Sequence, residues 1–187
     1  MEIARAWDVI DRVLHDRVPA VARTLRGPAS EAGIDRLAEA VGRELPEEFA
    51  ASLRIHDGQD NPTSLLDLFD HQTLMSAEAM IEHSAMRVDA LGDDLEDVAD
   101  WMEPEKVRPI MNCRGWLQFT QAEASGFALD LEPLPAGDYG QVIHLPVDGL
   151  TPAPEYASYA AWLSDLAERF EAGAFRVEDG DGIWLER

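Results

Sequence analysis

Residues 126–133 read Gly-Phe-Ala-Leu-Asp-Leu-Glu-Pro, and this stretch with its neighbours decides the fold. Its apolar side chains alternate with other residues, a pattern that predicts a β-strand. Alternation places Ala128 and Asp130 on one face of the strand. The opposite face then carries the large apolar side chains, which are Phe127, Leu129 and Leu131.

Asp130 is the one charged residue within the apolar run 127–131. In one interpretation its carboxylate is displayed on the sheet to contact a partner. In the alternative it is a solvated residue of an outer face, or it pairs with an arginine such as Arg108. We keep Asp130 as a candidate partner-binding residue and leave the alternative open.

Further runs of residues around this stretch also have strand character, at 107–112, 116–121 and 141–146. The connections between them carry turn residues, including Arg114-Gly115 and Ser125-Gly126. These short connections predict antiparallel pairing, because parallel strands need a crossover of about a dozen residues or more.

Apolar residues at helical spacing mark the rest of the chain. A helical segment over residues 1–25 should be interrupted at Pro19. A closing helix should begin near Glu155 and end at Gly173, followed by a hairpin over 175–185. The starts of three further helices are marked by a capping serine or a first-turn proline, at Ser30, Pro46 and Ser76.

This order of elements predicts an α+β fold, with a single, mostly antiparallel sheet flanked by helices. We expect residues 1–187 to form one domain. Residues 1–26 would be a helical addition at its N-terminus, and residues 174–187 would form a C-terminal hairpin.

The chain is strongly acidic: its 187 residues carry 37 acidic and 15 basic side chains, a formal net charge of -22. Such a charge repels nucleic-acid phosphates and anionic membranes, so we expect neither as a direct partner. It favours a basic protein partner. The hydrophobic fraction of 46% is typical of a globular protein and excludes an acidic disordered tail.

The acidic residues are densest between positions 89 and 105, where no basic residue occurs. Such runs are usually solvated loops. Large apolar side chains inside an acidic rim are also typical of a protein-binding surface. We therefore name as candidate partner-binding residues, besides Asp130, the following: Asp89, Asp93, Asp94, Glu96, Asp97, Asp100, Trp101 and Met102. In the alternative, Trp101 covers the edge of the sheet.

Motifs for catalysis, metals or cofactors are not found in the sequence. The five histidines form no metal-binding pair on one helix, and residues 178–182 are better explained by a hairpin turn than by a calcium loop. The single cysteine, Cys113, is interpreted as structural. We expect no catalytic residue, no metal and no cofactor.

The sequence also favours a cytoplasmic protein. A lone cysteine allows no intramolecular disulfide, which is typical of a reducing compartment. The first 25 residues lack the basic start and uncharged apolar core of a signal peptide. No window approaches the roughly 18 consecutive apolar residues of a membrane span.

Several blocks together resemble the SUKH superfamily and, within it, the Smi/Knr family of cell-wall-assembly regulators, in particular its bacterial members. Leu45-Pro46-Glu47-Glu48-Phe49 and Ile55-His56-Asp57-Gly58 are similar to the family's "LP-x-x-[FY]…N/D-G" signature. The other matching blocks are Trp101 with 107–110, then 126–133, 140–143 and 156–166, so the resemblance covers about residues 30–172. Val107 stands where the family has a second tryptophan, and Phe127 where it often has an acid.

This resemblance implies an α+β domain that binds proteins and has no known catalysis. Many bacterial members are predicted immunity proteins that neutralise toxins, whereas fungal members act in cell-wall signalling. The first hypothesis is thus an immunity protein that binds a basic toxin domain through its acidic surface. The alternatives are a regulator or scaffold in envelope assembly, and an enzyme whose site involves Cys113, His144 or Asp130.

Overall fold

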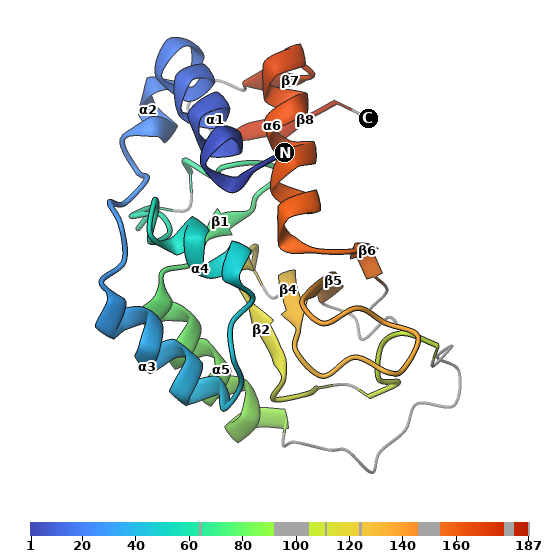
Figure 1. Ribbon diagram of the computed structural model, residues 1–187. Helices are drawn as coiled ribbons and strands as arrows, with labels where there is room; N and C mark the ends of the chain where they lie inside the picture. The colour runs from blue at the N-terminus through green and yellow to red at the C-terminus, as the bar shows by residue number, and fades with distance from the viewer. Residues whose placement is uncertain are drawn as a thin grey trace.

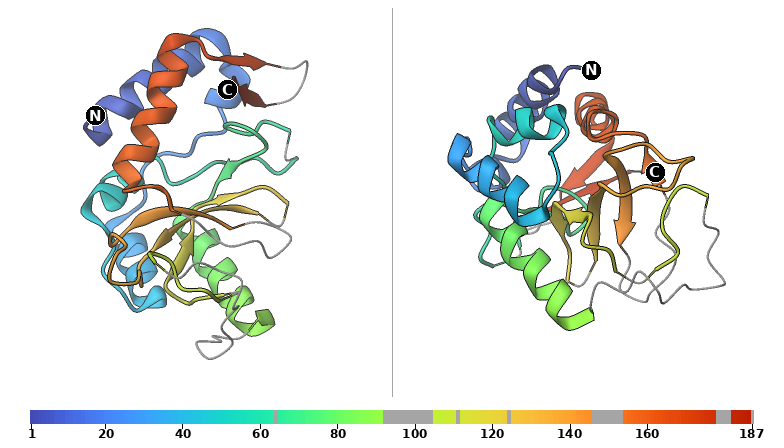
Figure 2. Two further views of the ribbon diagram at one scale, coloured as in Figure 1. Left: turned by 90° about the vertical axis from the view of Figure 1, so that its right-hand side faces the viewer. Right: turned by 60° about the horizontal axis from the view of Figure 1, so that its bottom comes forward.

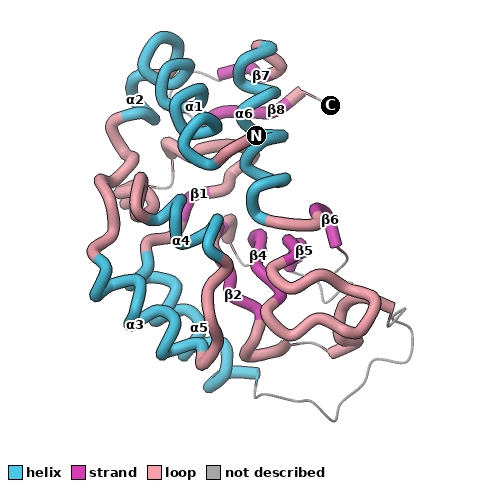
Figure 3. The backbone as a smooth tube through the Cα atoms, viewed as in Figure 1, coloured by secondary structure: helices cyan, strands magenta, loops and turns pink. Residues whose placement is uncertain are grey.

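The computed structural model describes residues 1–63, 65–91, 105–110, 112–123, 125–145, 154–177 and 182–186. Within them the helices are α1 (Ile3–Arg17), α2 (Pro19–Ala22), α3 (Glu31–Val41), α4 (Glu47–Leu53), α5 (Ala77–Leu91) and α6 (Tyr159–Ala172). The strands are β1 (Thr73–Leu74), β2 (Trp116–Gln118), β3 (Thr120–Gln121), β4 (Gly126–Asp130), β5 (Gln141–Leu145), β6 (Pro154–Tyr156), β7 (Phe175–Val177) and β8 (Ile183–Leu185). Helices gather in groups around a sheet of antiparallel strands, an arrangement typical of an α+β fold (Figures 1 and 3).

The helix boundaries follow the expected signals. The first helical segment ends at Arg17, and Pro19 starts the short helix α2. Ser30 caps α3 by accepting a hydrogen bond from the Gly33 backbone N–H at 3.1 Å. Helix α6 ends at Gly173, whose φ of 68° lies in the left-handed region that favours glycine.

The strands pair antiparallel, as predicted. Strands β2, β4, β5 and β6 form a four-stranded sheet in the order β2-β4-β5-β6, while β1 pairs with β3 and β7 pairs with β8 in separate two-stranded ribbons. The β7–β8 ribbon is the predicted C-terminal hairpin, whereas the end of the run 116–121 leaves the expected sheet and pairs with β1.

Two predicted boundaries are wrong. The run 107–112 forms turns and bends at its described positions, because Val107 and Ile110 point into a small core without pairing to a neighbouring strand. The closing helix starts at Tyr159, because Pro154–Tyr156 pairs with β5 and Ser158 caps the helix.

Both faces of the four-stranded sheet are covered. Helices α1 and α6 lie side by side over one face, and α3 and α5 lie together at the β2 edge (Figures 1 and 2). On β4, Leu129 belongs to the main core beneath the helices. The adjacent Ala128 belongs to a second cluster on the other face, made of Val107, Ile110, Cys113, Trp116, Ala128, Ile143 and Leu145.

Buried polar contacts attach helix α1 to the main core. The Trp7 indole N–H donates to Ser52 Oγ at 2.8 Å, and Ser52 Oγ lies 2.8 Å from the Tyr159 hydroxyl. This chain of contacts links α1, α4 and α6. At the other side of α1, His56 Nε2 lies 3.1 Å from the Asp11 carboxylate.

Trp162 on α6 should be a major contributor to stability. Its side chain is only 3% exposed and its ring centroid lies 4.9 Å from that of Phe119. We expect Trp162→Ala to lower the free energy of unfolding by about 3–5 kcal/mol, through lost burial and a residual cavity. Chemical denaturation measures this loss, and the half-buried Trp184 supplies a matched control whose replacement by alanine should cost less. Equal midpoints for wild type and Trp162→Ala would contradict the prediction.

Candidate functional site

Asp130 lies at the end of β4 and is fully buried, with an exposed fraction of 0%. Its Oδ2 accepts a hydrogen bond from Gln141 Nε2 at 2.9 Å, and its Oδ1 accepts one from the Glu132 backbone N–H at 3.0 Å. The expectation that Asp130 is displayed to a partner or solvated is therefore wrong. The physical reason is that the second cluster covers the face of the sheet that alternation assigns to Asp130.

Burial also changes the acidity of this carboxyl group. Removal from water raises the pKa of Asp130 from 3.8 to about 6, while the Gln141 hydrogen bond and the positive charge of Arg108 act in the opposite direction. Arg108 itself bonds elsewhere, because its Nε donates to the Glu132 carbonyl oxygen at 3.0 Å.

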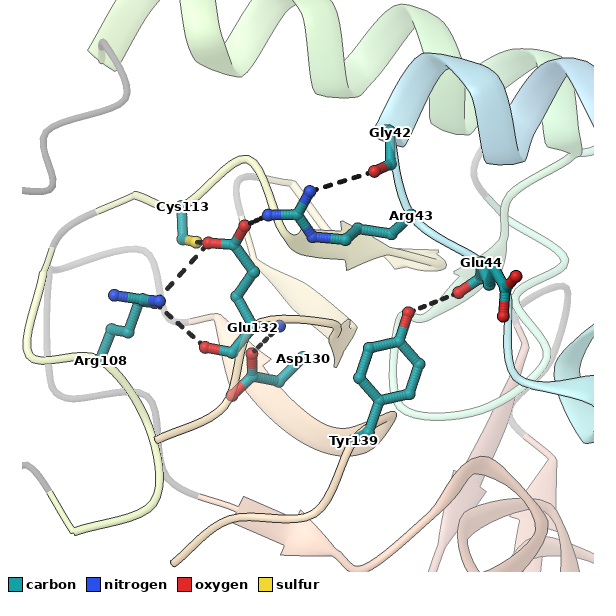
Figure 4. Close-up of polar contacts among 8 residues, drawn as sticks. All are labelled: Gly42, Arg43, Glu44, Arg108, Cys113, Asp130, Glu132 and Tyr139. Carbon is teal, nitrogen blue, oxygen red and sulfur yellow. Dashed lines mark hydrogen bonds and ion pairs between the residues drawn. The ribbon is translucent and has the colours of Figure 1, made fainter. Parts of the chain in front are cut away.

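Glu132, two residues after Asp130, is the centre of a cluster that joins three parts of the chain (Figure 4). Its carboxylate forms an ion pair with Arg43, which lies between α3 and α4, and lies 3.7 Å from Arg108 Nε. The Cys113 thiol donates to the same carboxylate at 3.4 Å and is 2% exposed. These contacts favour a structural role for Cys113.

The acidic run contributes little to the described surface. Asp89 is exposed near the end of α5. The remaining candidates, Asp93, Asp94, Glu96, Asp97, Asp100, Trp101 and Met102, lie outside the described residues. The predicted partner-binding role of this run stays a prediction.

The structure contains an acidic cavity that the sequence analysis missed. It has a volume of about 660 Å³, which is in the usual range for ligand sites. Its lining carries three carboxylates and neither lysine nor arginine, and consists of Asn61, Asp67, Asp70, His71, Gln72, Thr73, Gln121, Ala122, Glu123 and Ser125. We call this feature the acidic cavity.

The backbone around the acidic cavity is unusual. Asp70, His71 and Glu123 have φ values of 41°, 64° and 48°, in the left-handed region that residues with a side chain rarely adopt. They are the non-glycine residues with positive φ in the described part of the chain, and all three line the cavity. Such residues persist where surrounding contacts hold them, often at binding sites.

The contacts that hold this rim come from the C-terminal ribbon of β7 and β8. The Asp70 N–H donates to the Ile183 carbonyl oxygen at 2.7 Å, and the Leu185 N–H donates to Asp70 Oδ1 at 2.9 Å. The Trp184 and His71 rings also meet edge to face, with centroids 4.4 Å apart. The ribbon therefore braces one wall of the cavity.

Asp67 lies deepest among the carboxylates, with its side chain 7% exposed. Its Oδ1 accepts hydrogen bonds from Asn61 Nδ2 at 3.0 Å and from Thr73 Oγ1 at 2.8 Å. Its Oδ2 lies 3.7 Å from His71 Nδ1. The position of this charge is thus set by neighbours on both sides.

A smaller apolar groove of about 220 Å³ adjoins the acidic cavity and shares Asp70 with it. Aromatic and aliphatic side chains form its walls, chiefly Phe69, Phe127, Tyr156, Trp162, Leu166 and Leu185. The charged residues at its edge, Asp165 and Arg169, pair with each other at 2.8 Å. We call this feature the aromatic groove.

Within the described part of the chain, no three histidine, cysteine or carboxylate side chains are grouped so that they could hold a metal ion. The described helices include none that is both long and apolar enough to cross a membrane.

Comparison with known proteins places these features in a family context. The sequence model of the SMI1 / KNR4 family (SUKH-1) matches residues 28–166. The Schizosaccharomyces pombe "Cell wall biosynthesis/cell cycle regulator smi1" is 27% identical over 96% of this chain, and the Saccharomyces cerevisiae "Cell wall assembly regulator SMI1" is 24% identical over 96%. The chain spans 38% and 43% of these two relatives. The Homo sapiens "F-box only protein 3" is 35% identical over 57 residues, which are 30% of this chain and 12% of that protein.

The raised pKa of Asp130 has a consequence for stability that pH titration can measure. The folded state binds this proton more tightly than the unfolded chain, so the contribution of Asp130 to stability is greatest below about pH 4. As the pH rises through about 6, that contribution falls by on the order of 3 kcal/mol. An NMR titration of the side-chain carboxyl carbons should show Asp130 titrating near pH 6. A midpoint for Asp130 near 4 would contradict the prediction.

Proposed function

This chain belongs to the SMI1/KNR4 family (SUKH-1), and we propose that it is a non-enzymatic protein-binding domain that recognises a basic partner. The observation that carries the proposal is the acidic cavity, whose lining holds Asp67, Asp70 and Glu123 and neither lysine nor arginine. The net charge of -22 supports it, because a field of that sign attracts basic proteins over long range.

The arrangement of the enzyme candidates supports binding over catalysis. His144 pairs directly with Phe127 across β4 and β5, on the face of the main core. Cys113 lies in the second cluster on the opposite face, and Asp130 is buried. The sheet therefore separates His144 from Cys113, so they do not form a nucleophile and base pair.

The residues of the acidic cavity also favour binding. Ser125 supplies a hydroxyl group at the rim of the cavity, but its Oγ donates to the Ala122 carbonyl oxygen at 3.1 Å. Its proton is used within the turn. His71 and the carboxylates then present a polar surface for a bound cation.

Two biological settings suit such a binding domain. In the first, the chain is an immunity protein that neutralises a basic toxin domain in the cytoplasm, and the acidic charge supports this setting. In the second, it is a regulator of cell-wall assembly, and the names of the fungal relatives support that setting. The acidic cavity would bind the basic partner in both settings.

Binding of the protein encoded by the neighbouring gene tests this proposal. For an immunity protein, that neighbour should carry a basic toxin domain and should co-purify with this chain. Its dissociation constant should rise steeply between low and physiological salt, because electrostatic attraction is screened over about 8–10 Å.

Deletion of the gene separates the two settings. A regulator should give a cell-wall phenotype when no toxin is present, whereas an immunity protein should matter only in the presence of the toxin. Binding that does not respond to salt would contradict the electrostatic proposal in both settings.

A further inference from the structure

We propose that the acidic cavity seats an arginine residue of the partner, binding its guanidinium through carboxylates and its main-chain carbonyl through Gln72. This inference rests on the proposed function and adds the identity of the recognised side chain. It is drawn from the hydrogen-bonding groups that the cavity presents.

The acceptors of the cavity suit a planar cation with several N–H groups. Asp70 Oδ1 accepts from the Leu185 N–H, while Oδ2 has no hydrogen-bond donor among the residues that the structure describes. Asp67 Oδ2 and the exposed Glu123 carboxylate are the further acceptors. A guanidinium group donates through five N–H bonds in one plane, whereas an ammonium group has three donors on a single atom.

A chain of hydrogen bonds sets the orientation of the Gln72 side chain. The Phe127 N–H donates to Thr120 Oγ1 at 2.8 Å, and the Thr120 hydroxyl donates to Gln72 Oε1 at 2.6 Å. Gln72 Oε1 is therefore the acceptor, and its amide nitrogen is the atom left to donate.

That amide nitrogen indicates a ligand with an acceptor. Gln72 is only 6% exposed and lines the cavity, and its Nε2 has no hydrogen-bond partner among the residues that the structure describes. Nε2 is not itself fully buried, so water reaches it in the free protein, and a ligand that displaces this water must supply an acceptor in its place. The carbonyl oxygen of a peptide supplies an acceptor, which a simple metal ion or a polyamine lacks.

The aromatic groove adds a place for an apolar neighbour of the arginine. It begins at Asp70 and is small enough for one side chain. Arg169 at its edge is neutralised by Asp165 at 2.8 Å and does not repel a basic segment. We therefore expect the arginine to lie beside an apolar residue in the partner.

Titration of the ¹⁵N-labelled chain with small probes tests this inference without the natural partner. The main probe is N-acetyl-arginine N-methylamide, which carries a guanidinium and peptide carbonyls. Its backbone chemical-shift changes should be concentrated in residues 67–73 and 121–123. The citrulline analogue has the same shape without the charge, and should bind at least about tenfold more weakly because it loses charge-assisted hydrogen bonds.

A third probe examines the role of Gln72. Propylguanidinium has the cation but no carbonyl group, so it should bind more weakly than the arginine derivative and leave the Gln72 side-chain amide signals unshifted. Equal binding of the two compounds would overturn the carbonyl contact that we assign to Gln72.

Matched variants distinguish the cavity from the overall negative charge. Asp70→Asn retains an oxygen that can accept from the Leu185 N–H, and Glu123→Gln changes an exposed side chain. Each should weaken the arginine probe several-fold with an unchanged unfolding midpoint. Glu82→Gln removes the same charge from the exposed surface of α5, at a residue with no assigned role in binding, and should leave the affinity unchanged.

Equal affinity for the arginine and citrulline probes, or an equal effect of Glu82→Gln and Asp70→Asn, would overturn the inference. So would retention of full partner affinity by the double variant Asp70→Asn with Glu123→Gln, a result that would leave the proposed function intact. If the wild-type chain showed no salt-dependent binding of the partner, the proposed function itself would be contradicted.

Discussion

Strand β4 is buried on both faces, because a separate hydrophobic cluster packs against each of them. Leu129 packs into the main core beneath α6, while Ala128 packs into the second cluster. A carboxylate on such a strand is removed from water, and Asp130 persists there because Gln141 and a backbone N–H donate to it. The Glu132 cluster then attaches the segment between α3 and α4 to the same part of the sheet.

The parts of the fold that depend on local chemistry could be predicted from the sequence. Serine caps, the proline at position 19 and the glycine at 173 marked helix boundaries because each acts within a few residues of itself. The burial of the β4 face that carries Asp130 could not be predicted, because alternation shows that a second face exists and does not show what covers it. Its cover comes from the irregular segment around Val107 and Ile110, whose apolar residues had suggested a strand.

The acidic cavity could not be predicted for a related reason. Its lining residues come from two segments far apart in the sequence, at positions 61 to 73 and 121 to 125, and the ribbon that ends at Leu185 supports one wall. The turn at Asp70 and His71 has positive φ at both residues without glycine or asparagine, so the usual turn signal was missing. The abundance of carboxylates in the chain also hid the three that line the same cavity. The candidate run after Asp89, by contrast, was found from composition alone.

The bracing of the rim by the C-terminal ribbon has an entropic consequence. Asp70 and His71 are held in a rarely populated conformation by Ile183, Leu185 and Trp184, so the ordering of this loop has been completed during folding. A preorganised receptor loses little conformational freedom when a ligand arrives, and more of the contact energy is retained as affinity. The ribbon lies beyond residues 28–166, the part of the chain that the family's sequence model matches, so the rigidity of the cavity is supplied from outside that matched region.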